Sequence, residues 1–470
     1  MSSHREKSLV KNTLIISLGT FLPRLTSIIT LPILTAFLTN AEYGTLDLIN
    51  TLVSLLLPVA TLQIQLAAFR FLIDHRNKHE KSSKIITNIV VFIAATSLIT
   101  LTILFFSLHL LSIKIRVLIC LYFFIDIFYI TLQQIARGLS KNRLYSESAI
   151  VQSLINLFML ILTVYYFDSG LLGAILSLFS ATLLATIFLI TRGQIISFIN
   201  FKLISKTTIK KMISYSWPMV PNSLSLWVVN LSDRLIITGF LGIEANAIYA
   251  VSNKIPSLFS IVQTAFVFAW QESASIASKD EDSAAYYTSM FDNVYCVLIG
   301  LMSLLIAVTP ILFSLLIQGE YEASYYQMPI LFLGMLFSSL SSFMGGIYIA
   351  YLKTKSVGVT TIGAALLNLT INILLVNHIG IYAASISTLV SYLGLLIFRM
   401  IDLRKILKIN YNWTKVSFLL GILIFMSILS YQKINILNLV NAVIAIVLTV
   451  SINLKTLIGI KNLLMKKLKR

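Results

Sequence analysis

The sequence predicts an all-α integral membrane protein with about fourteen transmembrane helices, arranged as two six-helix lobes related by an internal repeat plus two C-terminal helices. Of the 470 residues, 57% are hydrophobic and 11% are charged, and the mean hydropathy is +0.90. Soluble domains carry about 25% charged residues. In addition, apolar runs long enough to cross a bilayer follow one another along the chain, and basic residues gather in alternate loops.

The apolar runs are separated by short polar breaks. The first six runs are residues 13–38, 45–69, 85–108, 117–136, 149–167 and 171–190. The next six are residues 217–241, 248–269, 295–316, 329–351, 359–376 and 381–398, and two more cover 413–429 and 436–454. We therefore expect an N-terminal lobe (1–191), a cytoplasmic basic linker that acts as a hinge (192–211), a C-terminal lobe (212–408), and a last helix pair with a basic cytoplasmic tail (409–470).

The distribution of basic residues predicts the orientation, because cytoplasmic loops carry an excess of Lys and Arg. With the N-terminus placed inside, thirty basic residues fall in inner loops and three fall outside, namely Lys114, Arg116 and Lys433. We therefore expect both termini in the cytoplasm. The net charge of +18 is explained by topology, so no nucleic-acid partner is expected.

An internal repeat supports the division into lobes. Residues 168–177 lie 210 positions before residues 378–387, and the two stretches share a glycine, an alanine and a serine. These pairs are Gly170 with Gly380, Ala174 with Ala384 and Ser177 with Ser387. A second correspondence places Pro23 and Pro221 early in the first and seventh runs, with Glu42 and Glu244 in the turns that follow.

The sequence contains no recognisable metal-binding or nucleotide-binding motif. The two cysteines, Cys120 and Cys296, lie in apolar runs and are read as small core residues, so no metal cluster is expected. No GxxxxGK[ST] loop is present, and we expect no cofactor.

The stretch 14–47 has Pro23-Arg24 early in the run and Asn40-Ala-Glu-Tyr-Gly44 after it. With the Ser216-Trp-Pro-Met-Val-Pro221 start of the second lobe, it resembles Wzx-type polysaccharide (O-antigen and capsule repeat-unit) flippases of the MOP superfamily, which share the MATE-like fold. The resemblance implies translocation of an undecaprenyl-diphosphate-linked glycan from the cytoplasmic to the outer leaflet by alternating access. It also implies a bacterial inner-membrane location, contact with membrane lipids, and a polysaccharide polymerase and chain-length proteins as partners.

Ionisable residues inside membrane spans cost about 2.5 to 3.5 kcal/mol on insertion scales, so they usually face a cavity or a partner. Arg24, Arg234 and Lys254 are the candidate headgroup cations, because a guanidinium or ammonium group can bind phosphate oxygens. Asp126 and Asp233 are candidate counter-ions or coupling residues.

Each candidate also has a structural interpretation. Arg234 could pair with Asp233 or Asp126, and Lys254 could extend to the interface. Asp47 and Glu272 lie near run ends, where solvated or helix-dipole roles are expected.

Two further basic residues, Arg70 and Arg137, end even-numbered runs at the inner face. They either line a cytoplasmic mouth that attracts an anionic lipid or serve as positive-inside anchors.

Three other functions make different demands on the sequence. A MATE-like exporter of cationic drugs would be expected to place carboxylates inside its cavity, whereas here the intramembrane set includes three cations. A polysaccharide polymerase would need catalytic groups on a large outer loop, and the outer loops here are short, so we do not expect an enzyme. A peptidoglycan-precursor flippase would use the same lipid carrier with a different glycan. The sequence does not decide which glycan is carried or whether H⁺ or Na⁺ is coupled.

Overall fold

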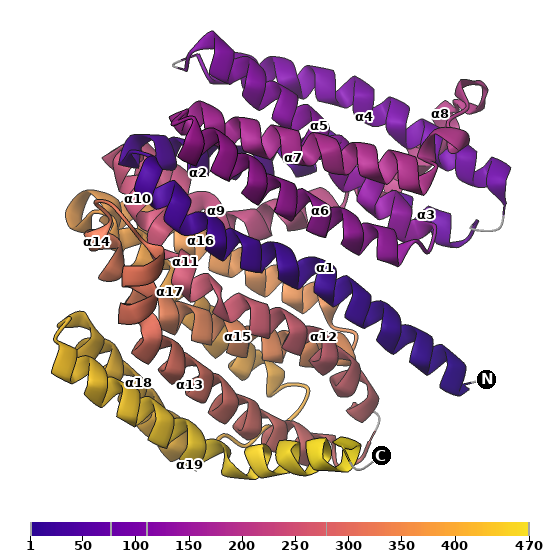
Figure 1. The fold of residues 1–470 in the computed structure, drawn as a ribbon. Helices are drawn as coiled ribbons and strands as arrows, with labels where there is room; N and C mark the ends of the chain where they lie inside the picture. The colour runs from indigo at the N-terminus through magenta and orange to yellow at the C-terminus, as the bar shows by residue number, and fades with distance from the viewer. Residues whose placement is uncertain (1, 76–77, 110, 279, 469–470) are drawn as a thin grey trace. The chain divides into compact units, whose positions relative to one another are not determined.

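The computed structural model describes residues 2–75, 78–109, 111–278 and 280–468, and all regular elements within these ranges are helices (Figure 1). The chain divides into two compact units, Met1–Leu235 and Ile236–Arg470. We describe each unit by itself. The lobe limits expected from the sequence stay a prediction.

Unit 1 holds the first six predicted spans, the linker and the start of the seventh span. Its α-helices are α1 (Ser2–Phe37), α2 (Asn40–Thr61), α3 (Ile64–Ile73), α4 (His79–Ser107), α5 (Ile113–Gly138), α6 (Asn142–Leu160), α7 (Gly170–Gly193), α8 (Lys206–Ser216) and the first part of α9 (Met219–Leu241). A π-helical turn, Ile161–Tyr166, continues α6, and the linker contains two 3₁₀ turns, Ile195–Phe198 and Phe201–Leu203. Helices α6 and α7 pack side by side, and α1 packs on α6.

Unit 2 contains the remaining spans. Its helices are α10 (Ile243–Ser252), α11 (Lys254–Ser257), α12 (Phe259–Ala277), α13 (Ser283–Leu316), α14 (Glu322–Tyr325), α15 (Met328–Ala350), α16 (Thr354–Ile379), α17 (Tyr382–Leu403), α18 (Trp413–Tyr431) and α19 (Asn435–Leu468). Helix α17 packs against both α15 and α16, and α19 packs along α13.

The predicted fold class is confirmed. Each of the fourteen apolar runs falls on helical structure, and within the described residues twelve helices are long and apolar enough to cross a membrane. The other two runs are the first, which lies within the 36-residue helix α1 and contains the apolar stretch Phe21–Phe37, and the eighth, which is interrupted.

The second and eighth runs were predicted as continuous helices, and the structure breaks both. In the second run, Leu62 (φ 45°) and Gln63 (φ 57°) are both left-handed, which ends α2 and starts α3 in a new direction. In the eighth run, turns at Asn253 and Leu258 separate α10, α11 and α12. Pro256 contributes to this break because it has no N–H to donate to the preceding turn.

The repeat expected from sequence has a counterpart in local structure. Gly170 (φ 50°), at the start of α7, and Gly380 (φ 61°), two residues before α17, both have a positive φ, which residues with side chains rarely adopt. One serine on each of these helices is fully buried and contacts an asparagine on the preceding helix. The pairs are Ser177 with Asn156 (3.2 Å) and Ser387 with Asn368 (3.4 Å).

The carboxylate of Glu42 joins the starts of α2 and α7. Its Oε2 accepts from the backbone N–H and the hydroxyl of Thr39, both at 3.0 Å, while the Glu42 N–H donates to Thr39 Oγ1. Its Oε1 accepts from the Leu171 N–H at 3.1 Å. This capping box therefore also supplies an acceptor for an N-terminal amide of α7, which has no partner within its own helix.

The linker is hydrogen-bonded to α4. Asn88 is fully buried, its Nδ2 donates to the Leu203 carbonyl at 2.9 Å, and its Oδ1 accepts from the Ser205 N–H at 2.7 Å. Beside it, Thr87 Oγ1 donates to the Phe198 carbonyl and accepts from the Asn200 N–H. The linker is thus held in a defined position on unit 1.

Candidate functional site

An ion pair lies between α2 and the part of α9 that belongs to unit 1. Arg234 Nε donates to Asp47 Oδ2 at 2.8 Å, and each side chain is 12% exposed. Arg234 Nη1 also donates to the Asn230 carbonyl at 3.3 Å. Of the two roles expected for Asp47, solvated or helix-dipole, the solvated one was wrong, because its carboxylate is largely buried and paired.

The same two helices are joined by further polar contacts. The indole N–H of Trp227 donates to Ser54 Oγ at 3.0 Å and to the Thr51 carbonyl at 3.3 Å. Just beyond the end of α2, Gln63 Nε2 donates to Ser223 Oγ of α9 at 3.1 Å. Residue numbers rise along α2 while they fall along α9, so the helices run antiparallel. We call the contacts Asp47–Arg234, Ser54–Trp227 and Gln63–Ser223 the polar ladder.

The polar ladder ends at the break between α2 and α3. One tertiary and one local hydrogen bond support the break, since Ser216 Oγ of α8 donates to the Leu62 carbonyl at 2.8 Å and the Gln63 N–H donates to Thr61 Oγ1 at 3.1 Å. Gln65 Nε2 donates to Gln63 Oε1 at 3.0 Å. The bonds to the Leu62 carbonyl and from the Gln63 N–H satisfy backbone groups that an interrupted helix leaves open, and such groups need partners inside a membrane.

Arg24 lies in α1 directly after Pro23, and its side chain is half-buried. Its backbone carbonyl accepts from Ser27 Oγ at 2.7 Å. Because Pro23 cannot donate to the preceding turn, α1 is weakened one residue before this cation.

Lys254 lies in unit 2 and is the first residue of α11, within the interrupted eighth run. Its side chain is half-buried, and its carbonyl accepts from Ser257 Oγ at 2.7 Å. The two aspartates lie in unit 1. Asp126 is half-buried on α5, and Asp233, which is 2% exposed, precedes Arg234 on α9.

The two arginines predicted at the cytoplasmic mouth have different surroundings. Arg70, at the end of α3, forms an exposed ion pair with Asp74 at 2.9 Å. Arg137, at the end of α5, donates to Gln134 Oε1 at 3.1 Å and lies over the rings of Phe69 (4.8 Å) and Tyr145 (5.4 Å). Arg137 therefore contributes to packing between α3, α5 and α6.

Sequence reasoning missed a buried cation in unit 2. Arg399 was counted among the inner-loop residues because it follows an apolar run, yet it is 5% exposed inside α17. It donates to Thr360 Oγ1 (3.1 Å), the Ser341 carbonyl (2.7 Å), Thr361 Oγ1 (3.1 Å) and the Val357 carbonyl (3.4 Å). A four-residue spacing could have revealed it, because Ser391, Leu395 and Arg399 continue one buried face of the helix.

In the residues that the structure describes, His, Cys, Asp and Glu side chains do not form any group of three that could hold a metal ion.

The sequence of this chain matches a known protein family. The family model described as "Polysaccharide biosynthesis protein" matches residues 9–271, more than half of the chain. An uncharacterized membrane protein of Methanocaldococcus jannaschii is 25% identical over 312 residues, which cover 62% of this chain and 60% of the relative. The chain thus spans about three fifths of the length of this curated relative.

Solved structures share the fold at low sequence identity. An inward-facing multidrug resistance MATE family transporter of the MOP superfamily superposes with a TM-score of 0.67 at 11% identity, covering 83% of this chain and 98% of the other. A MOP superfamily transporter from Pyrococcus furiosus gives a TM-score of 0.58 at 11% identity, with coverages of 85% and 96%. The chain therefore shares the MATE-like fold of these structures, as the sequence predicted.

Proposed function

Because this chain belongs to the polysaccharide biosynthesis protein family, we propose that it is a flippase for undecaprenyl-diphosphate-linked oligosaccharide repeat units. It would carry them from the cytoplasmic to the outer leaflet of a bacterial inner membrane by alternating access, with both termini in the cytoplasm. The observation that carries the proposal is the family match over residues 9–271 on a MATE-like fold. The proposal includes no catalytic step, and it keeps a polysaccharide polymerase and chain-length proteins as partners.

The proposed headgroup cations are Arg24, Arg234 and Lys254. Arg24 and Lys254 are half-buried in interrupted or proline-containing helices, where a charged side chain needs a polar partner. Arg234 already pairs with Asp47, so its charge is largely compensated. Arg24 is the residue that the test below changes, because a guanidinium can bind two phosphate oxygens at once.

The membrane potential has the sign that favours outward movement of an anionic headgroup. A diphosphate that leaves a cytoplasm of negative potential gains about 2.3 kcal/mol per charge per 100 mV. The proposal therefore requires no nucleotide hydrolysis by this chain.

The test is mass spectrometry of lipid-linked oligosaccharides in a strain lacking the protein. We expect the complete undecaprenyl-diphosphate repeat unit to accumulate, and the wild-type gene to clear it. Arg24→Ala should clear it at least tenfold more slowly, and Arg24→Lys should clear it partly. Arg143→Ala is the matched control, because this arginine is 83% exposed and should leave clearance unchanged. No accumulation of the lipid in the deletion strain would overturn the flippase proposal.

A MATE-like exporter is the second candidate, and its support is the fold shared with multidrug resistance transporters. An exporter predicts that deletion raises susceptibility to cationic drugs while the surface glycan stays unchanged. The flippase predicts the opposite pair of results.

A further inference from the structure

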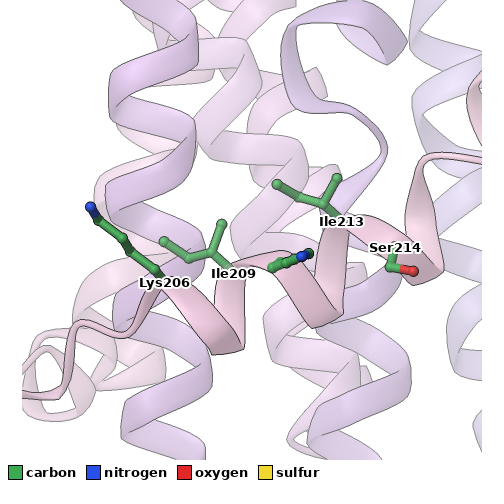
Figure 2. A pocket seen from close by; sticks show the side chains of 5 residues that line it. Lys206, Ile209, Ile213 and Ser214 are labelled. Carbon is green, nitrogen blue, oxygen red and sulfur yellow. The ribbon is translucent and has the colours of Figure 1, made fainter.

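We propose that the linker between α7 and α9 is a docking surface for anionic phospholipid headgroups of the membrane leaflet that it faces. This inference goes beyond the transported substrate. It concerns one open cavity on α8, about 370 Å³ in volume, lined by Lys206, Ile209, Lys210, Ile213 and Ser214 (Figure 2).

The charge of the linker is of one sign. Residues 192–217 contain five basic residues and no Asp or Glu. Lys206 and Lys210 are four residues apart on α8, so their ammonium groups share one side of the helix, and both are exposed. Within the described part of the chain, no ion pair joins either lysine to a carboxylate. Two like charges at this spacing repel each other, and an anion between them would remove that cost.

Lys211 has a different environment. Its ammonium group lies 5.8 Å from the ring of Phe71 on α3, and the neighbouring Tyr215 ring meets the same phenylalanine edge-on at 5.7 Å. Met212 is fully buried. One side of α8 therefore packs on α3, and Lys206 and Lys210 remain exposed to an external partner.

The chemistry around the cavity favours a lipid over a soluble anion. Ile209 and Ile213 line the cavity together with the two lysines. Further large apolar side chains between α7 and α9 are exposed, namely Ile196 (69%), Phe201 (68%), Ile204 (46%) and Trp217 (56%). Apolar and aromatic side chains next to basic ones are typical of segments that lie at the bilayer interface. A free phosphate would engage the lysines only, whereas a phospholipid would also cover the apolar side chains.

The surface is held in place before any lipid binds. Asn88 and Thr87 of α4 bind the backbone on either side of Phe201, and the His79 ring stacks on Phe198 at 4.6 Å. In addition, Ser205 caps α8 by accepting from the Thr208 N–H. Because the backbone is already ordered, binding does not have to order it.

The proposal can be tested by native mass spectrometry of the purified full-length protein after delipidation. The probes are phosphatidylglycerol and phosphatidylcholine with identical acyl chains. Wild type should bind phosphatidylglycerol more tightly, and this preference should fall as salt rises. Each lysine near an anionic surface contributes about fivefold in affinity, so Lys206→Gln/Lys210→Gln should weaken phosphatidylglycerol binding about 25-fold.

Two matched variants make the result specific. Lys78→Gln/Lys81→Gln removes the same charge from exposed positions of unit 1 outside the cavity and should change the affinity by less than twofold. Lys206→Arg/Lys210→Arg keeps the charge and should bind as wild type does, which separates charge loss from misfolding. Equal weakening in both Gln pairs, or no weakening in the cavity pair, would overturn the proposal. Displacement of phosphatidylglycerol by an equal concentration of inorganic phosphate would show a soluble-anion site and overturn it as well.

Discussion

Arg399 joins three helices through neutral oxygen atoms. Its guanidinium on α17 donates to the Ser341 carbonyl on α15 and to groups of Val357, Thr360 and Thr361 on α16. A guanidinium carries five N–H donors in a fixed planar arrangement, and Arg399 donates four hydrogen bonds here. The charge is therefore buried with hydrogen bonds in several directions, which makes this side chain a structural clamp of unit 2.

Replacement of Arg399 by lysine should destabilise the protein by about 1 to 3 kcal/mol, because an ammonium cannot reach acceptors on both helices and leaves some of them unpaired. The measurement is the thermal unfolding midpoint of the purified protein in detergent. Arg404→Lys is the control, since Arg404 is exposed one residue beyond α17. An equal effect at both positions would contradict the clamp.

The Asp47–Arg234 pair should show strong energetic coupling. Both side chains are 12% exposed, so removal of one partner leaves a charge largely removed from water. In a double-mutant cycle of Asp47→Asn and Arg234→Gln, we expect a coupling energy of about 1 to 3 kcal/mol. The same cycle on the exposed pair Arg143–Glu147 should give at most about 0.5 kcal/mol. Similar values for the two pairs would contradict the burial argument.

At the scale of elements, the sequence predicted where the helices lie, and it did not predict where two of the runs are broken. Hydropathy detects the apolar runs, because burial in lipid needs about 20 apolar residues whatever the local backbone does. The break at Leu62 and Gln63 is supported by two tertiary bonds, one donated by Ser216 and one accepted by Ser223, which no local pattern contains. For the same reason the partner of Arg234 could not be predicted. Asp47 is 187 positions away and one of several carboxylates near the spans.

The start of α7 offers an element-level prediction. A Cβ at Gly170 would collide with Glu42 Oε1, and its φ of 50° disfavours any side chain. Gly170→Ala should therefore destabilise the protein by about 1 to 3 kcal/mol. Gly363→Ala is a control for which we expect the opposite change in stability, since Gly363 is exposed within α16 and an added Cβ would meet open space. It should stabilise by up to about 1 kcal/mol. Both effects appear as shifts of the unfolding midpoint, and destabilisation by both variants would contradict the assignment.

At the scale of the whole molecule, the family and the MATE-like fold were predictable because helix number, repeat and proline positions are read directly from the chain. The headgroup residues were not predictable to the same degree. Charge inside a span signals a need for a partner, and it does not distinguish a substrate from a buried carboxylate such as Asp47. Only the surrounding helices make that distinction, as they do for Arg399.

The membrane orientation is the remaining whole-molecule prediction, and the direction of the proposed transport depends on it. In a background with Cys120 and Cys296 replaced by alanine, we introduce Lys114→Cys or Lys202→Cys, both at exposed positions. The basic-residue distribution places Lys114 outside and Lys202 inside. A membrane-impermeant maleimide should therefore label the first variant in intact cells and the second only after lysis. The reverse pattern would invert the topology. The membrane potential would then oppose the movement of a diphosphate away from the face that carries the linker, so a proposal of transport in that direction would need another source of energy.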